Sequence, residues 1–302
     1  MAPAEDDISI EEKRVYAGTA GRTDAYVATE GGVVRVALSA DKIGAFDMVA
    51  RDPARDAAVL PRRAGPDLLG VATPEGLRVA SVVDDPAFDP VDADPVASDP
   101  LVAVGVHDGA FLVAGEGGAV ARVDPGDDGT DPTATAIGTA PEPRAIDGPL
   151  VAASDGVHRV TEPVKPSAAP DLVAVGLGDA RDVAGAGMPL AATAEGVYWL
   201  GNGWMTALEG DATAVAADGD GHAMAVVEGD LFVHDGADEW EAETWTAATL
   251  PVDEVPAALG YGPGVSVGVT DAGTLCVDAG DGWRHQVIGV RDPAGVALSA
   301  VE

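Results

Sequence analysis

An acidic residue and a glycine recur together seven times along this chain, each time between two short apolar runs. The glycines are Gly32, Gly76, Gly118, Gly156, Gly196, Gly229 and Gly273. Successive glycines lie 33 to 44 residues apart. Because glycine accepts the positive φ of a tight hairpin turn, each pair marks a turn between two strands. A period of about 40 residues is typical of a β-propeller, in which each repeat forms one small sheet.

The runs beside the turns are apolar almost throughout, as in residues 25–29 (Ala-Tyr-Val-Ala-Thr) and 111–115 (Phe-Leu-Val-Ala-Gly). A strand with one face in solvent would carry a polar residue at every second place. Continuous apolar runs indicate strands that are covered on both faces, as in a blade that lies between two others.

Each hairpin has candidates for two further strands. A run of small residues precedes it, which suits the crowded inner strand of a blade. These runs are residues 54–59, 101–104, 143–146, 180–183, 212–215 and 255–259. An outer run, often with an aromatic residue, follows the hairpin, as in residues 204–208, 245–248 and 283–288. The repeat therefore predicts four strands, which is one propeller blade.

The two ends of the chain predict how the ring closes. Residues 293–300 form another small-residue inner run, but no hairpin follows them, and the hairpin of 25–36 lacks such a run. We therefore expect the C-terminal strand to complete blade 1 of an all-β, seven-bladed β-propeller. The whole chain, 1–302, is expected to form one domain with residues 1–20 as an N-terminal extension or outer strand. An eighth blade from residues 8–20 stays open, and segments 82–100 and 124–133 are expected to be surface loops.

The chain is strongly acidic, with 51 acidic against 17 basic residues and a net charge of −34 in 302 residues. One explanation is an acidic partner-binding protein, such as a nucleic-acid mimic. The other is adaptation to a cytosol at molar salt, where the Debye length falls to about 3 Å and self-repulsion is screened. The acids are scattered through every repeat and only three lysines occur, which favours the second explanation. No basic stripe is present to bind nucleic-acid phosphates.

Nothing in the sequence indicates export or a membrane. Residues 1–13 are acidic and contain no apolar core of a signal peptide, and no apolar stretch reaches the length of a membrane span. We expect a soluble, cytoplasmic protein that does not bind membranes. The one cysteine, Cys276, lies in an apolar run and is expected to be a small core residue.

Recognisable catalytic or metal-binding motifs are missing. The five histidines (His107, His158, His222, His234 and His285) show no metal-type pairing, and residues 124–129 and 218–221 resemble calcium loops without the closing glutamate. The sequence also lacks a nucleophile elbow, a phosphate-binding loop and a dinucleotide fingerprint. We therefore expect no cofactor, no metal and no catalytic residues, although a propeller can assemble a site from scattered loops.

Arginine recurs at one position of the inner runs. Arg55, Arg144 and Arg181 each occupy the second place of such a run, at what should be one mouth of the channel. The hairpin turns at the same face carry Glu30, Glu75, Glu116, Asp155, Glu195, Glu228 and Asp271. Two interpretations remain open: the arginines pair with carboxylates and tie blade to blade, or they form a mouth that binds an anionic ligand or an acidic side chain of a partner. A second set, Arg35, Arg78, Arg122 and Arg159, is expected to be structural.

Three segments, residues 12–16 (Glu-Lys-Arg-Val-Tyr), 25–36 and 53–56 (Pro-Ala-Arg-Asp), resemble a haloarchaeal β-propeller family. The resemblance implies a propeller fold and a salt-loving archaeal source. It transfers no functional residue, because no established activity accompanies the family. The repeats are only loosely similar to WD-type blades.

The sequence thus predicts a non-catalytic propeller that serves as a protein-interaction or ligand-binding platform, with a protein partner of unknown identity. The alternative is a metal-dependent hydrolase or lactonase-like propeller with its site at the channel mouth. The fold cannot decide between them, since propellers host both roles.

Overall fold

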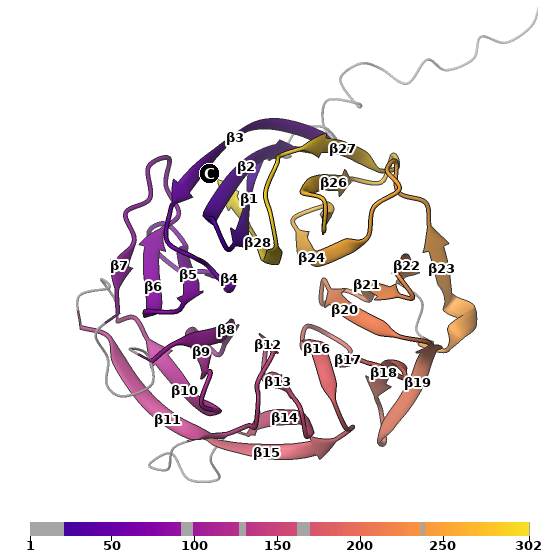
Figure 1. Ribbon diagram of the computed structural model, residues 1–302, viewed down its shortest axis with the longest axis horizontal. Helices are drawn as coiled ribbons and strands as arrows, with labels where there is room; N and C mark the ends of the chain where they lie inside the picture. The colour runs from indigo at the N-terminus through magenta and orange to yellow at the C-terminus, as the bar shows by residue number, and fades with distance from the viewer. Residues whose placement is uncertain (1–20, 92–98, 127–130, 162–169, 237–238, 302) are drawn as a thin grey trace, which may run out of the picture.

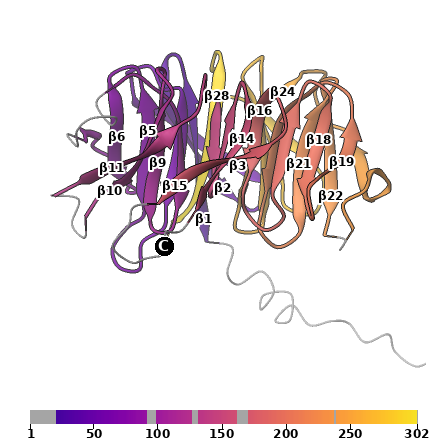
Figure 2. The same ribbon diagram turned by 90° about the horizontal axis from the view of Figure 1, so that it is seen from below.

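The computed structural model describes residues 21–91, 99–126, 131–161, 170–236 and 239–301. Within these residues, the strands form seven four-stranded antiparallel sheets that stand around a central axis (Figure 1). The side view shows the blades standing side by side, with their strands running between the two faces of the ring (Figure 2). The predicted seven-bladed, all-β propeller is confirmed.

Each blade is numbered in chain order and given from the channel outward. Blades 1 to 3 are β28 (Pro293–Val301), β1 (Arg22–Thr29), β2 (Gly32–Ser39), β3 (Lys42–Ala50); β4 (Asp56–Leu60), β5 (Leu68–Thr73), β6 (Gly76–Ser81), β7 (Asp89–Pro90); and β8 (Leu101–His107), β9 (Ala110–Gly115), β10 (Ala119–Asp124), β11 (Thr133–Thr139). Blades 4 and 5 are β12 (Ala145–Asp147), β13 (Leu150–Ala153), β14 (Gly156–Thr161), β15 (Asp171–Gly176); and β16 (Ala180–Ala184), β17 (Leu190–Thr193), β18 (Gly196–Leu200), β19 (Trp204–Glu209). Blades 6 and 7 are β20 (Ala212–Ala217), β21 (His222–Val227), β22 (Asp230–Asp235), β23 (Trp245–Ala248), with the short 3-10 helix η1 (Ala242–Thr244) before it; and β24 (Pro256–Gly262), β25 (Val265–Thr270), β26 (Thr274–Asp278), β27 (Arg284–Val287).

The C-terminal strand closes the ring as predicted. β28 pairs antiparallel with β1, from Arg22 opposite Val301 to Val27 opposite Val296. Blade 1 therefore takes its inner strand from one end of the chain and its other three from the opposite end (Figure 1). Pairing the two ends removes the seam at which the ring could otherwise open.

The acid-glycine turns have a common internal structure in three blades. In the first turn, the Thr29 hydroxyl donates to the carbonyl of Gly32 at 2.8 Å and accepts the N–H of Gly31 at 3.1 Å. Gly32 has φ +126°, and a Cβ there would collide with the Ala50 carbonyl of β3. The same threonine–glycine contact recurs at Thr73 and at Thr193. A buried hydroxyl and a residue without a side chain therefore let β3 pass close to the turn.

The core is divided into layers between neighbouring blades, which is why the strands are apolar on both faces. Val36 of β2 and Leu275 of β26 belong to the layer between blades 1 and 7, and Phe111 of β9 belongs to the layer between blades 2 and 3. Cys276 is fully buried, as expected, and burial raises the pKa of its thiol to about 11.

The structure differs from the sequence prediction in one loop. Segment 82–100 was expected to be a surface loop, but it contains the two-residue outer strand β7, and Val91 is buried in the core between blades 2 and 3. The open question of a strand within residues 8–20 lies outside the described residues. Among the residues described, no helix is long and apolar enough to cross a membrane.

Candidate binding site at the channel mouth

The inner strands surround a channel along the axis of the ring. Its cavity of about 380 Å³ is lined by residues of all seven inner strands. Each inner strand starts at the face where the acid-glycine turns lie, because strand direction alternates within a blade. We call this face the turn face and its opening the mouth.

The structure brings the three predicted arginines to this mouth, and each reaches the blade that follows its own. Their Nη1 atoms donate to the carbonyls of the next inner strand: Arg55 to Leu101 at 3.2 Å, Arg144 to Ala180 at 3.0 Å and Arg181 to Ala212 at 3.2 Å. All three arginine side chains are about one-third exposed. This repeated contact is the inter-blade tie of the first interpretation.

Each of these arginines also pairs with a carboxylate. Arg144 and Arg181 contact Asp179 and Asp211 at 2.7 Å, whereas Arg55 lies 3.8 Å from Glu116. Asp179 and Asp211 lie just before their inner strands rather than in the hairpin turns, and for this reason the repeat alone did not reveal them.

The seven turn carboxylates play different parts. Glu116 joins Arg55, and Glu228 accepts the N–H of Asp211 at 2.8 Å. Glu75 pairs with Arg78 and Asp155 with His158, both away from the channel arginines. The remaining three, Glu30, Glu195 and Asp271, are exposed at their turns. Among the contacts of the described residues, Glu116 and Glu228 are thus the turn carboxylates that belong to the arginine network.

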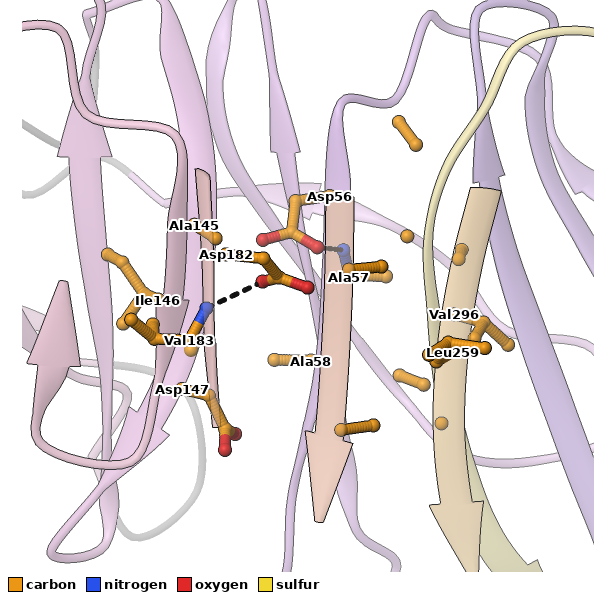
Figure 3. Close-up of a pocket in the computed structure, with 18 of the residues that line it drawn as sticks. Asp56, Ala57, Ala58, Ala145, Ile146, Asp147, Asp182, Val183, Leu259 and Val296 are labelled. Atoms are coloured by element: carbon orange, nitrogen blue, oxygen red, sulfur yellow. Dashed lines mark hydrogen bonds between the residues drawn. The ribbon is translucent and has the colours of Figure 1, made fainter. Parts of the chain in front are cut away.

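Sequence reasoning missed three aspartates that point into the channel from β4, β12 and β16 (Figure 3). Asp56 accepts the N–H of Ala57 through Oδ1 at 2.8 Å and the N–H of Val104, in the next blade, through Oδ2 at 2.9 Å. Asp182 likewise accepts the N–H of Val183 through Oδ1 and the N–H of Val215, in the next blade, through Oδ2, both at 2.9 Å.

Asp147 lies two residues further along its inner strand and makes a similar link, accepting the N–H of Gly185 in blade 5 at 2.6 Å. The signal for two of the three was present in the sequence, because Asp56 and Asp182 directly follow Arg55 and Arg181. In two of these three blades the repeated unit is thus an Arg-Asp pair and not an arginine alone.

The channel disfavours the ionised form of these carboxyls. Burial raises the pKa of Asp56 to about 8 and that of Asp182 to about 7, while the backbone N–H bonds oppose the rise. Neighbouring carboxylates raise both values further. Burial also raises the pKa of Asp147. Among the described residues, the groups that lower these pKa values are backbone N–H donors rather than side-chain cations.

Another part of the channel wall is apolar. It is built from small and aliphatic residues of blades 7 and 1, including Ala257 and Leu259 of β24 and Ala294 and Val296 of β28. Figure 3 shows the labelled carboxyls on one side and Leu259 and Val296 on the other. The channel therefore has a carboxyl-bearing side and an apolar side.

A second hollow opens on the turn face between blades 6 and 7. Its volume is about 680 Å³, and it is lined by the turn residues 228–231 and by residues 247–256. Four acidic residues and several apolar ones line it, among them the exposed Val255. The turn face thus offers two concave features.

The second arginine set holds outer parts of the blades. Arg35 donates to the carbonyl of Asp84 at 2.7 Å, Arg78 pairs with Glu75, and Arg122 donates to the carbonyls of His107 and Asp108. Arg159 is exposed on β14. The first three contacts are consistent with the structural role expected of this set.

The remaining candidate chemistry is dispersed. Across the described ranges, no group of three or more histidine, cysteine, aspartate or glutamate residues is arranged to hold a metal ion. In the loop of residues 218–221, Asp218 accepts the N–H groups of Asp220 and His222 and lies 2.7 Å from the His222 ring. These contacts account for the resemblance to a calcium loop.

Solved structures with the same fold belong to proteins of different kinds. Apo AztD from Citrobacter koseri aligns with a TM-score of 0.53 at 13% identity, over 91% of this chain and 84% of its own. YCF48 bound to D1 peptide gives 0.58 at 14%, over 93% and 97%. Virginiamycin B lyase from Staphylococcus aureus gives 0.57 at 9%, over 80% and 87%. At these identities the likeness shows the fold alone.

The sequence comparisons give the family. None of the curated proteins matches the chain. A family model described as HVO_0234-like beta propeller matches residues 9–299, which is nearly the whole chain. The chain therefore belongs to the HVO_0234-like β-propeller family.

Proposed function

We propose that this protein is a non-catalytic binding platform whose site is the mouth of the channel on the turn face. The group that enters the mouth is a cation, either an amine or a basic side chain of a protein partner. One observation carries this choice. The arginines at the mouth are already paired with carboxylates, whereas in the described part of the chain only backbone N–H donors lower the pKa values of Asp56, Asp147 and Asp182.

Electrostatics explains the preference for a cation. A carboxyl in a low-dielectric site ionises more readily when a positive charge is nearby, and the gain in interaction energy goes to binding. An anion would approach the same carboxyls and the acidic turns around them. The geometry thus favours a cationic group over the anionic ligand that the arginine pattern suggested.

The apolar wall adds a shape requirement. An alkyl chain attached to the cation can lie against Leu259 and Val296 while its charged end meets the carboxyls across the channel. A lysine side chain or a short diamine has this form. The alternative of a metal-dependent hydrolase has no comparable support in the described residues.

The charge distribution favours a cytosol at molar salt as the working environment, in agreement with the haloarchaeal resemblance. High salt screens the net charge of −34 beyond a few ångströms. Contacts made inside the narrow channel are screened less, so a buried cation–carboxyl contact can persist there.

The test is a pair of probes of equal length and opposite charge. Protein labelled with ¹³C at alanine methyl groups is titrated at molar KCl with putrescine, a diamine, and separately with succinate, a dianion. The proposal expects putrescine to shift the signals of Ala57, Ala257 and Ala294, which line the channel. Signal shifts with succinate but not with putrescine, or no shifts with either probe, contradict the proposal.

A matched pair of variants locates the site. Asp182→Asn removes a channel charge with little change in volume, and it should weaken putrescine binding. Asp108→Asn removes an exposed charge at a turn on the opposite face and should leave binding unchanged. Equal effects of the two substitutions would mean that binding follows net charge and not the channel.

A further inference from the structure

The outer half of blade 6 holds a buried histidine. His234 lies on β22 and is 1% exposed. Its ring is enclosed by Trp240 and Trp245, which are themselves 5% and 6% exposed. The cluster lies outside the channel and takes no part in the proposed binding site.

Both ring nitrogens of His234 face carbonyl oxygens. Nδ1 lies 2.8 Å from the carbonyl of Gly221, and Nε2 lies 2.8 Å from the carbonyl of Glu239. A carbonyl oxygen can only accept, so each contact needs a proton on the nitrogen. A neutral imidazole has one N–H and one bare nitrogen, which would place two lone pairs against each other in one of the contacts. Two donors exist only in the imidazolium form.

The aromatic neighbours suit a cation. The Trp240 ring stacks on His234 with centroids 4.0 Å apart and planes 8° from parallel. Trp245 lies at 5.3 Å and is tilted by 55°. The face of an indole attracts a positive charge, and the attraction grows when water is excluded.

The charged groups on the surrounding elements also favour a positive ring. Asp218 and Asp220 lie on the turn before β21, Asp235 ends β22, and Glu239, Glu241 and Glu243 lie on the segment between β22 and β23. His222, half-exposed, is the one basic group on these elements and is held by Asp218. Apart from His222, the titratable groups near the cluster are therefore acidic.

We infer that His234 is a buried imidazolium that clasps blade 6 by joining the turn at Gly221 to the segment at Glu239. The two N–H groups of this ring satisfy both carbonyl oxygens, which a neutral ring cannot do.

The direct test is the protonation of the ring, read from ¹⁵N chemical shifts of the five histidines in the intact protein at pH 7. We expect two protonated nitrogens for His234. A bare-nitrogen signal from His234 at this pH overturns the inference. This measurement needs no variant and does not depend on binding at the channel.

A variant tests the consequence for stability. His234→Phe keeps an aromatic ring between the tryptophans but removes both donors, and the melting temperature should fall by roughly 3 to 6 °C at pH 6. His285→Phe, on the exposed face of β27, is the matched control and should change little. A melting temperature of His234→Phe equal to that of the parent contradicts the clasp.

Discussion

Arg55 and Asp56, adjacent in the chain, hold the same neighbouring strand in opposite ways. Arg55 donates to the carbonyl of Leu101, and Asp56 accepts the N–H of Val104, three residues further along β8. Arg181 and Asp182 do the same to Ala212 and Val215 of β20. The dipeptide satisfies one acceptor and one donor of an inner strand that has no strand partner on its channel side. It therefore fixes the position of one blade against the next.

The first prediction concerns the arginine halves of these contacts. Replacing Arg55, Arg144 or Arg181 by alanine should destabilise the protein by about 0.5–1.5 kcal/mol each, since each loses one charge-assisted bond to a carbonyl and a partly exposed ion pair. Thermal melts at molar salt measure the loss. Arg159→Ala, at an exposed position, is the control. Unchanged melts in all three variants would show that these contacts are not ties.

The second prediction is a pH dependence from the aspartate halves. The pKa of Asp56 is about 8 and that of Asp182 about 7 in the folded protein, against about 3.9 in an unfolded chain. Folding therefore favours the protonated carboxyl, so the stabilisation is complete below about pH 4 and is lost as pH rises through 7 to 8. Stability measured by urea unfolding should decline from pH 5 to pH 9.

Substitution identifies the groups responsible for that decline. Asp56→Asn and Asp182→Asn cannot ionise, so the double variant should show a flatter profile between pH 5 and pH 9 than the parent. Asp108→Asn, on the exposed turn, should keep the parent slope. A double variant that retains the full slope would assign the pH dependence to other groups.

The sequence was sufficient to predict the ring because its evidence is repeated. Seven turns and the run at 293–300 each give a weak signal, but together they specify four strands per blade and closure at β28. β7 was missed because its two residues, Asp89 and Pro90, carry no apolar pattern and lie in an acidic, proline-rich segment. A strand of that length is defined by its pairing with Arg78 and Val79 and not by its own composition.

The site was predictable only in part, for a different reason. The position of Arg55 in an inner run predicted its place at the mouth, but its partners come from another blade and 46 residues away. Periodicity predicts which positions are equivalent and does not specify which atoms meet between blades. The pKa of Asp56 depends on burial by such neighbours and is therefore a property of the assembled ring.

A third prediction tests the packing between blades 2 and 3. Gly70 of β5 leaves room for Phe111 of β9, because a Cβ at Gly70 would lie 2.5 Å from the phenyl ring. Gly70→Ala should cost about 1–3 kcal/mol through overpacking. Gly117→Ala, with open space around it, is the control.

A second substitution shows whether the clash is the cause. Phe111→Leu alone should destabilise by leaving a void, but combined with Gly70→Ala it should recover part of the loss, since leucine lacks the ring edge that meets the new methyl. Chemical unfolding of the four proteins gives the coupling energy. Simple additivity of the two losses would show that Gly70 is needed for another reason.

The last prediction concerns the threonines of the turns. Thr29, Thr73 and Thr193 are each at most 3% exposed. The Thr29 hydroxyl donates to the carbonyl of Gly32 and accepts the N–H of Gly31. Thr29→Val keeps the shape and removes both hydrogen bonds of this buried hydroxyl, including the one to the buried Gly32, so a loss of about 1–3 kcal/mol is expected. Thr29→Ser retains the hydroxyl and should lose less, which unfolding at molar salt can resolve. Equal losses in the two variants would assign the effect to packing of the methyl group and not to the hydrogen bonds.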